Sequence, residues 1–155
     1  MNFVIDLSRE KRSDVNARVL VVEDNKDLLE LFSRQLQILG FQVSVAKNGV
    51  EALAVALTDH PDVILMDIEM PGMNGLETVS RIRANPETRR IPVMAITGWA
   101  FRNSRQTYMA SGFNDYIAKP FTHKELLPAI AQLLRDSNKQ SEASSMIAPA
   151  KTRPE

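Results

Sequence analysis

The chain contains no cysteine, no long apolar segment and no excess of either charge. Without cysteine it has no disulfides, no cysteine-based zinc site and no thiol nucleophile. No apolar run approaches the roughly 18–20 residues that a membrane-spanning helix needs. Residues 1–9 lack the charged start and long apolar centre of a signal peptide, so a cytoplasmic location is expected. Because 19 basic side chains balance 19 acidic ones, a nucleic-acid-binding surface over the whole protein is not expected.

Length and composition indicate one globular domain with flanking segments. The 155 residues, 44% of them apolar, suffice for a sizeable core. Residues 1–16 mix charged and polar side chains and are interpreted as an N-terminal extension. Residues 17–136 hold the expected domain. Residues 137–155 are rich in serine and polar side chains, and we expect them to form a disordered tail.

Four short apolar runs, separated by segments with helical spacing, predict buried parallel strands. They cover residues 19–22, 63–66, 92–96 and 116–118. A fifth run, residues 42–46, alternates between apolar and polar side chains, as a strand near a sheet edge does. This alternation of strands and helices predicts a doubly wound α/β fold with a parallel sheet.

Capping residues and breakers delimit five expected helices. Asn25 and Asn48 are candidate N-caps, and Gly40 and the pair His60-Pro61 end the helices that follow them. Further helices are expected near residues 75–84, over residues 99–111 and from Thr122 onward. Pro128 should kink the last helix or shift its start.

Polar residues stand where the expected strands end. They are Glu23, Asp24, Asp67, Thr97 and Lys119. Function in an open parallel sheet gathers outside the carboxyl ends of its strands. Three carboxylates close to a single lysine repel one another, and a bound cation lowers the free energy of this arrangement. The sequence therefore predicts a divalent-metal site beside a reactive carboxylate.

The same residues carry a resemblance to a known family. An acidic pair follows the first strand, Asp67 the third, Thr97 the fourth and Lys119-Pro120 the fifth, and residues 64–75 match a phosphoacceptor loop closely. In this order the motifs resemble the CheY-like receiver domain of two-component response regulators, over roughly residues 17–135. The resemblance implies a five-stranded, flavodoxin-like sheet of strand order 2-1-3-4-5 with five helices. We expect a single-domain receiver, because no second domain fits after residue 137.

The resemblance also assigns roles at the site. Asp67 is the expected phosphoacceptor, which takes a phosphoryl group from a histidine kinase or a histidine phosphotransfer protein. Glu23, Asp24, Asp67 and the backbone carbonyl of Glu69 are the expected ligands of Mg²⁺ (or Mn²⁺), with no other cofactor. Lys119 is the expected cationic partner of the phosphoryl oxygens, aimed inward by a cis bond to Pro120, and Thr97 their hydroxyl donor.

Two residues are expected to transmit the modification. Family resemblance makes Thr97 and Tyr116 the switch pair. Gly98 leaves room for the phosphoryl group, and Glu69 and Trp99 flank the mouth of the site.

The face of the fourth helix, fifth strand and fifth helix is expected to change on phosphorylation. The residues expected on it are Arg102, Arg105, Tyr116 and Phe121. It is then expected to bind a downstream protein or a second copy, with no direct contact to nucleic acid or membrane. The chain is expected to be a switch that catalyses only its own phosphorylation and dephosphorylation, not a metabolic enzyme.

Taken singly, each residue has a plainer interpretation. Asp67 alone is typical of a loop start or helix cap. The pair Glu23-Asp24 is typical of a first helical turn favoured by the helix dipole. Lys119 alone would be a surface lysine, and Tyr116 an ordinary strand tyrosine.

Three other functions remain open at this point. An aspartate-nucleophile phosphatase carries an Asp-x-Asp pair after a strand, whose counterpart here is Asp67-Ile68-Glu69. A flavodoxin-like cofactor binder needs a phosphate loop rich in small residues after the first strand. Residues 23–25 would instead repel a cofactor phosphate in the absence of a metal ion. The chain is also consistent with a receiver segment of a hybrid histidine kinase.

Overall fold

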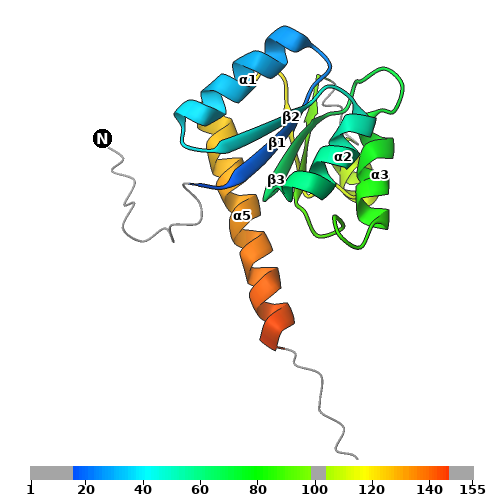
Figure 1. The fold of residues 1–155 in the computed structure, drawn as a ribbon, viewed down its shortest axis with the longest axis vertical. Coiled ribbons are helices and arrows are strands. Elements are labelled where there is room, and N and C mark those ends of the chain that lie inside the picture. Colours follow the sequence, from blue (N-terminus) through cyan, green and yellow to red (C-terminus); the bar gives the residue numbers. More distant parts are fainter. Residues whose placement is uncertain (1–15, 99–103, 147–155) are drawn as a thin grey trace, which may run out of the picture.

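A parallel sheet flanked by helices forms the body of the protein in the computed structural model, which describes residues 16–98 and 104–146 (Figure 1). The strands are β1 Arg18–Val22, β2 Gln42–Ala46, β3 Val63–Asp67, β4 Val93–Thr97 and β5 Asp115–Ala118. The helices are α1 Lys26–Ile38, α2 Gly49–Asp59, α3 Gly75–Ala84, α4 Ser104–Ser111 and α5 His123–Met146. Strands and helices alternate along the chain, as the sequence pattern predicts.

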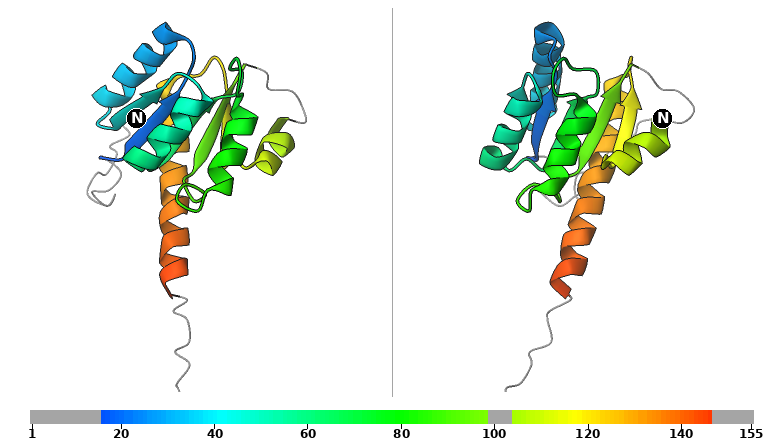
Figure 2. Two further views of the ribbon diagram at one scale, coloured as in Figure 1. Left: turned by 45° about the vertical axis from the view of Figure 1, so that its right-hand side comes forward. Right: turned by 90° about the vertical axis from the view of Figure 1, so that its right-hand side faces the viewer.

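The strands pair in the order β2-β1-β3-β4-β5, and every pairing is parallel. Helices α2, α3 and α4 cover one face of the sheet, and α1 and α5 cover the other (Figure 2). Each face has its own hydrophobic core. In β1, Leu20 and Val22 point into the core under α2, α3 and α4, and Val19 and Val21 point into the core under α1 and α5. The predicted doubly wound fold and its strand order are confirmed.

Local side-chain chemistry sets the helix boundaries. Asn25 caps α1 by accepting hydrogen bonds from the backbone N–H groups of Asp27 and Leu28, and Asn48 caps α2 by accepting from Glu51. Gly40 takes a positive φ of 98° just after α1, which is the conformation that ends helices with glycine. The predicted caps at these positions are confirmed.

The structure corrects the expectation of a disordered tail from residue 137. Helix α5 continues through Met146 and projects beyond the sheet (Figure 1). Its polar composition suggested disorder, but residues 129–146 contain no glycine or proline and many good helix formers, so nothing local ends the helix. Pro128 lies within the helix, whose first residue is His123. The N-terminal extension up to residue 15 and the tail from residue 147 lie outside the described residues.

Within residues 16–98 and 104–146, no helix combines the length and apolar character that crossing a membrane requires.

Arg83 ties together loops at the end of the sheet opposite the carboxyl ends of the strands. Its guanidinium donates to the carbonyls of Gly112, Arg89 and Ile91 and to the side-chain oxygen of Asn114, at 2.6–2.9 Å. The same Asn114 oxygen accepts from the N–H of Val93, the first residue of β4. Burial lowers the pKa of Arg83 from its usual value. One side chain thus joins α3 to the segments that enter β4 and β5.

Replacing Arg83 with methionine should lower the free energy of unfolding by about 2–3 kcal/mol, since it leaves several partly buried acceptors without their charged donor. Urea denaturation followed by circular dichroism measures the change. The control is Arg81→Met on the same helix. Arg81 is exposed and pairs with Glu77 one turn away, so its loss should change stability by less than about 0.5 kcal/mol. Equal stability of the two variants would contradict the role assigned to Arg83.

Candidate functional site

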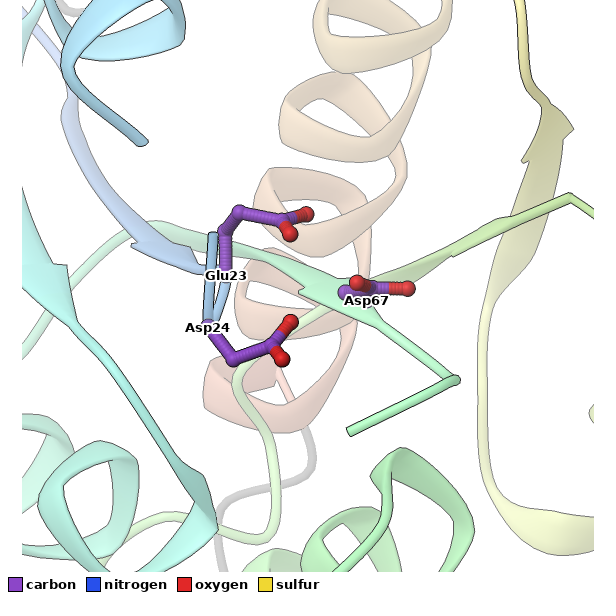
Figure 3. A group of neighbouring side chains, drawn as sticks. All are labelled: Glu23, Asp24 and Asp67. Atoms are coloured by element: carbon purple, nitrogen blue, oxygen red, sulfur yellow. The ribbon is translucent and has the colours of Figure 1, made fainter. Parts of the chain in front are cut away.

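Three carboxylates meet at the carboxyl edge of the sheet. Glu23 and Asp24 directly follow β1, and Asp67 is the last residue of the adjacent strand β3. One oxygen from each lies within 4.8 Å of the others, and Figure 3 shows the three side chains pointing toward one another. Glu23 and Asp67 are each only 3% exposed, whereas Asp24 is exposed. Clustered, hard oxygen donors open to solvent on one side fit the ligand preference of Mg²⁺.

Lys119 supplies the positive charge that faces this cluster. Its Nζ lies 3.3 Å from Oε2 of Glu23 and 3.4 Å from Oδ2 of Asp67. The residue follows β5, and its backbone N–H donates to the carbonyl of Thr97 at 2.8 Å. The Lys119-Pro120 peptide bond is cis, as the family resemblance implies.

The charges at the site do not balance within the protein. Burial, and secondly the carboxylate of Asp67, raise the pKa of Glu23 to about 7. Burial also raises the pKa of Asp67, against the opposing effect of Lys119. Burial disfavours the charged form of Lys119, but the carboxylates of Asp67 and Glu23 outweigh it and raise the pKa of that lysine. The site therefore holds more negative charge than its ammonium compensates, which favours a bound cation.

The loop after β3 holds Asp67 in place. The other oxygen of Asp67, Oδ1, accepts from the backbone N–H of Glu69 at 3.1 Å. Gly75 closes the loop by donating its N–H to the carbonyl of Ile68. A Cβ at Gly75 would lie 2.7 Å from the carbonyl oxygen of Asp67 and 2.9 Å from Cα of Ile68, so this close approach requires glycine.

Thr97 and Glu69 contact each other across the mouth of the site. The hydroxyl of Thr97, the last residue of β4, is fully buried and donates to Oε1 of Glu69 at 3.0 Å. Oε2 of Glu69 accepts from the N–H of Gly98 at 3.3 Å. The sequence predicts a role for the backbone carbonyl of Glu69 and a position of its side chain at the mouth. It does not predict that the carboxylate binds both Thr97 and Gly98.

Tyr108 is a residue of this region that the sequence reasoning missed. It lies on α4, is 7% exposed, and its hydroxyl is 3.1 Å from Oγ1 of Thr97. Its ring centroid is 5.8 Å from that of the half-buried Tyr116. The available signal was an aromatic residue in a largely polar helix, which is expected to point toward the sheet.

The expected partner face is partly outside the described residues. Trp99 and Arg102 fall in the undescribed stretch, so α4 is described only from Ser104. Arg105 lies 6.0 Å from the ring centroid of Tyr116, as expected for neighbours on this face. Phe121 instead stacks on Phe32 of α1, with ring centroids 5.2 Å apart. It therefore packs into the core on the α1 and α5 side of the sheet.

Comparisons with known proteins agree with this geometry. The family described as response regulator receiver domain matches residues 19–131. The polar-differentiation response regulator DivK of Brucella ovis is 34% identical over 119 residues, which are 77% of this chain and 97% of DivK. The response regulator MprA of Mycobacterium bovis is 33% identical over 85% of this chain, and PleD of Caulobacter vibrioides is 37% identical over 84%. The chain spans only 56% of MprA and 30% of PleD.

Two solved structures share the fold. The chemotaxis protein CheY4 of Vibrio cholerae superposes with a TM-score of 0.72 at 32% identity, covering 76% of this chain and 98% of CheY4. The receiver domain of the sensor histidine kinase PA1611 of Pseudomonas aeruginosa, solved with a magnesium ion coordinated in its active-site cleft, gives 0.71 at 33% identity. It covers 77% of this chain and 98% of that domain. With a match over residues 19–131 and the acidic site in place, the chain belongs to the response regulator receiver domain family.

Proposed function

We propose that this chain is a phosphorylation-dependent signalling switch. It accepts a phosphoryl group on Asp67 from the phosphohistidine of a histidine kinase or phosphotransfer protein. It then changes its α4–β5–α5 face to bind a downstream protein or a second copy. The observation that carries the proposal is the position of Asp67, buried at the end of β3 between the carboxylates of Glu23 and Asp24 and the ammonium of Lys119. A cytoplasmic location is part of the proposal.

The transfer is a displacement at phosphorus. A carboxylate oxygen of Asp67 forms the new P–O bond while the P–N bond to the donor histidine breaks, and the leaving imidazole keeps the electron pair and takes up a proton. Lys119, already within 3.4 Å of Asp67, is placed to meet a phosphoryl oxygen. The backbone N–H of Glu69 fixes the other carboxylate oxygen, Oδ1.

The charge balance of the site explains its proposed metal. Glu23, Asp24, Asp67 and the backbone carbonyl of Glu69 would hold Mg²⁺ (or Mn²⁺). When bound, this ion neutralises the carboxylates and the phosphoryl oxygens. The two oxygens of Glu23 already accept from the N–H of Asn25 at 3.2 Å and from Lys119 at 3.3 Å. Asp24 is thus the acid with more freedom to act as a direct ligand.

Dephosphorylation removes the phosphoryl group at the same site and needs no active site of a second protein. Water attacks the phosphorus of the acyl phosphate and regenerates the Asp67 carboxylate and inorganic phosphate. The chain therefore catalyses only its own modification and its loss. This distinguishes it from an aspartate-nucleophile phosphatase, which turns over external esters.

Asp67 is the expected site of modification. Incubation with acetyl phosphate and Mg²⁺ should add one phosphoryl group to the wild type, measured by intact-mass spectrometry. Asp67→Asn should show no gain, because the amide is not a nucleophile for phosphorus. The exposed Asp62→Asn serves as the control for loss of a carboxylate and should be modified normally. A phosphoryl gain in Asp67→Asn would refute the assignment.

Mg²⁺ should bind before phosphorylation, because it relieves the repulsion among the three carboxylates. In a calorimetric titration, Asp24→Ala should weaken binding by about tenfold or more, and by more than Glu23→Ala does. Asp27→Ala, which removes an exposed acid of α1 from outside the cluster, should leave the affinity unchanged. Unchanged affinity in Asp24→Ala would contradict the proposed ligand set.

Thr97 should be needed for transmission and not for modification. Thr97→Ala should still gain the phosphoryl mass but lose the changes in amide hydrogen exchange over residues 105–116 that accompany it. Thr97→Ser keeps the hydroxyl and should retain those changes, which separates the hydroxyl from the packing of the side chain. If Thr97→Ala responds as the wild type does, Thr97 is not part of the switch.

A further inference from the structure

The hydroxyl of Thr97 is the centre of a hydrogen-bond chain across three segments. Glu69, from the loop after β3, accepts from it at 3.0 Å, and Tyr108, from α4, lies 3.1 Å on its other side. The second oxygen of Glu69 accepts from the N–H of Gly98. Tyr108 and Thr97 are buried, so this chain runs from the edge of the site into the core beneath α4.

Hydrogen-bond chemistry gives the chain a direction. An ionised carboxylate only accepts, so Glu69 receives the hydrogen of Thr97. The contact between Thr97 and Tyr108 then takes its hydrogen from Tyr108. Tyr108 therefore donates to Thr97, which donates to Glu69, and each hydrogen bond polarises the next.

Glu69 occupies donors that lie beside the phosphoacceptor. Asp67 pairs in register with Ile96, so Thr97 and Gly98 follow directly at the end of the adjacent strand. The two carboxylate oxygens of Glu69 accept from the hydroxyl of Thr97 and from the N–H of Gly98. Two oxygens of a phosphoryl group would accept from the same two donors. A phosphoryl group on Asp67 therefore competes with Glu69, and Thr97 has one hydrogen to give.

Tyr108 connects that exchange to the packing of α4. Its ring meets Tyr116 of β5, with centroids 5.8 Å apart, and lies edge-on to Phe113, with centroids 6.2 Å apart. When Thr97 turns toward the phosphoryl group, its oxygen moves relative to the Tyr108 hydroxyl. Either Tyr108 follows or the bond breaks. Because the ring is buried, both outcomes displace its neighbours.

We propose that Glu69 and Tyr108 are positioning residues for Thr97. Glu69 holds the Thr97 hydroxyl and the Gly98 N–H in the unmodified protein and must be displaced by the phosphoryl group. Tyr108 passes that displacement to α4 and Tyr116. The inference rests on the function proposed above and adds two residues to it.

Beryllofluoride with Mg²⁺ is the probe for the first part, because it binds an aspartate carboxylate as a phosphoryl mimic. In a titration followed by backbone NMR, Glu69→Ala should bind it about threefold to tenfold more tightly than the wild type, since the competing acceptor is gone while the backbone carbonyl remains. Glu77→Ala, an exposed acid of α3, is the control and should bind as the wild type does.

Glu69→Gln distinguishes competition for the donors of Thr97 and Gly98 from repulsion by the negative charge of Glu69. Its amide oxygen still accepts from Thr97, so its affinity should lie between those of the wild type and Glu69→Ala. If Glu69→Gln binds as tightly as Glu69→Ala, repulsion by the charge explains the effect and the competition is refuted. Equal affinities of Glu69→Ala and Glu77→Ala also refute it.

Tyr108→Phe tests the second part at saturating beryllofluoride. This variant should still bind the probe, but the amide shift changes of residues 105–111 and Tyr116 should fall to less than about half of those in the wild type. Ser111→Ala removes a hydroxyl of the same helix that bonds only to the carbonyl one turn earlier, and it should retain the changes. Loss of stability alone would not produce this split. Full changes in Tyr108→Phe overturn the assignment.

The two proposals fail in different ways. If the wild type and Asp67→Asn both show no beryllofluoride binding, the proposed function is wrong. If the wild type binds and Asp67→Asn does not, the function stands. The responses of Glu69→Ala and Tyr108→Phe then decide the inference alone.

Discussion

The ion pair of Lys119 with Glu23 and Asp67 is the interaction on which the site depends. Two nearly buried carboxylates and one ammonium lie within 3.4 Å, and their charges do not cancel. Burial raises the pKa of both acids, so the folded protein holds them at a cost in free energy that a cation or a new covalent group can relieve.

The parallel sheet makes this arrangement possible. Its strands end at one edge, so the residues that end or directly follow β1, β3, β4 and β5 converge although they are far apart in sequence. Below this edge, hydrophobic cores pack against both faces of the sheet. At the opposite end of the sheet, Arg83 joins the loops by hydrogen bonds to Gly112 and Asn114.

Much of the fold and site was predictable because it rests on local signals. Apolar runs marked the strands, and asparagine caps with glycine stops marked the helix ends at Asn25, Asn48 and Gly40. The prediction of a disordered tail from residue 137 was wrong, because it rested on polar composition. The absence of helix breakers instead lets α5 continue to Met146. The predicted position of Phe121 on the partner face was wrong, because tertiary packing alone decides that its ring stacks on Phe32.

By itself the sequence determined the fold class and the acidic, lysine-bearing edge, since strand period and strand-end chemistry are properties of short segments. Tertiary structure alone decided the side-chain partners of that edge. Glu69 binds Thr97 and Gly98, and Tyr108 reaches Thr97 from α4. Such contacts join residues 11 to 29 positions apart, and they depend on the packing angle of a helix and the path of a loop. No local pattern encodes those two quantities, because many distant contacts set them together.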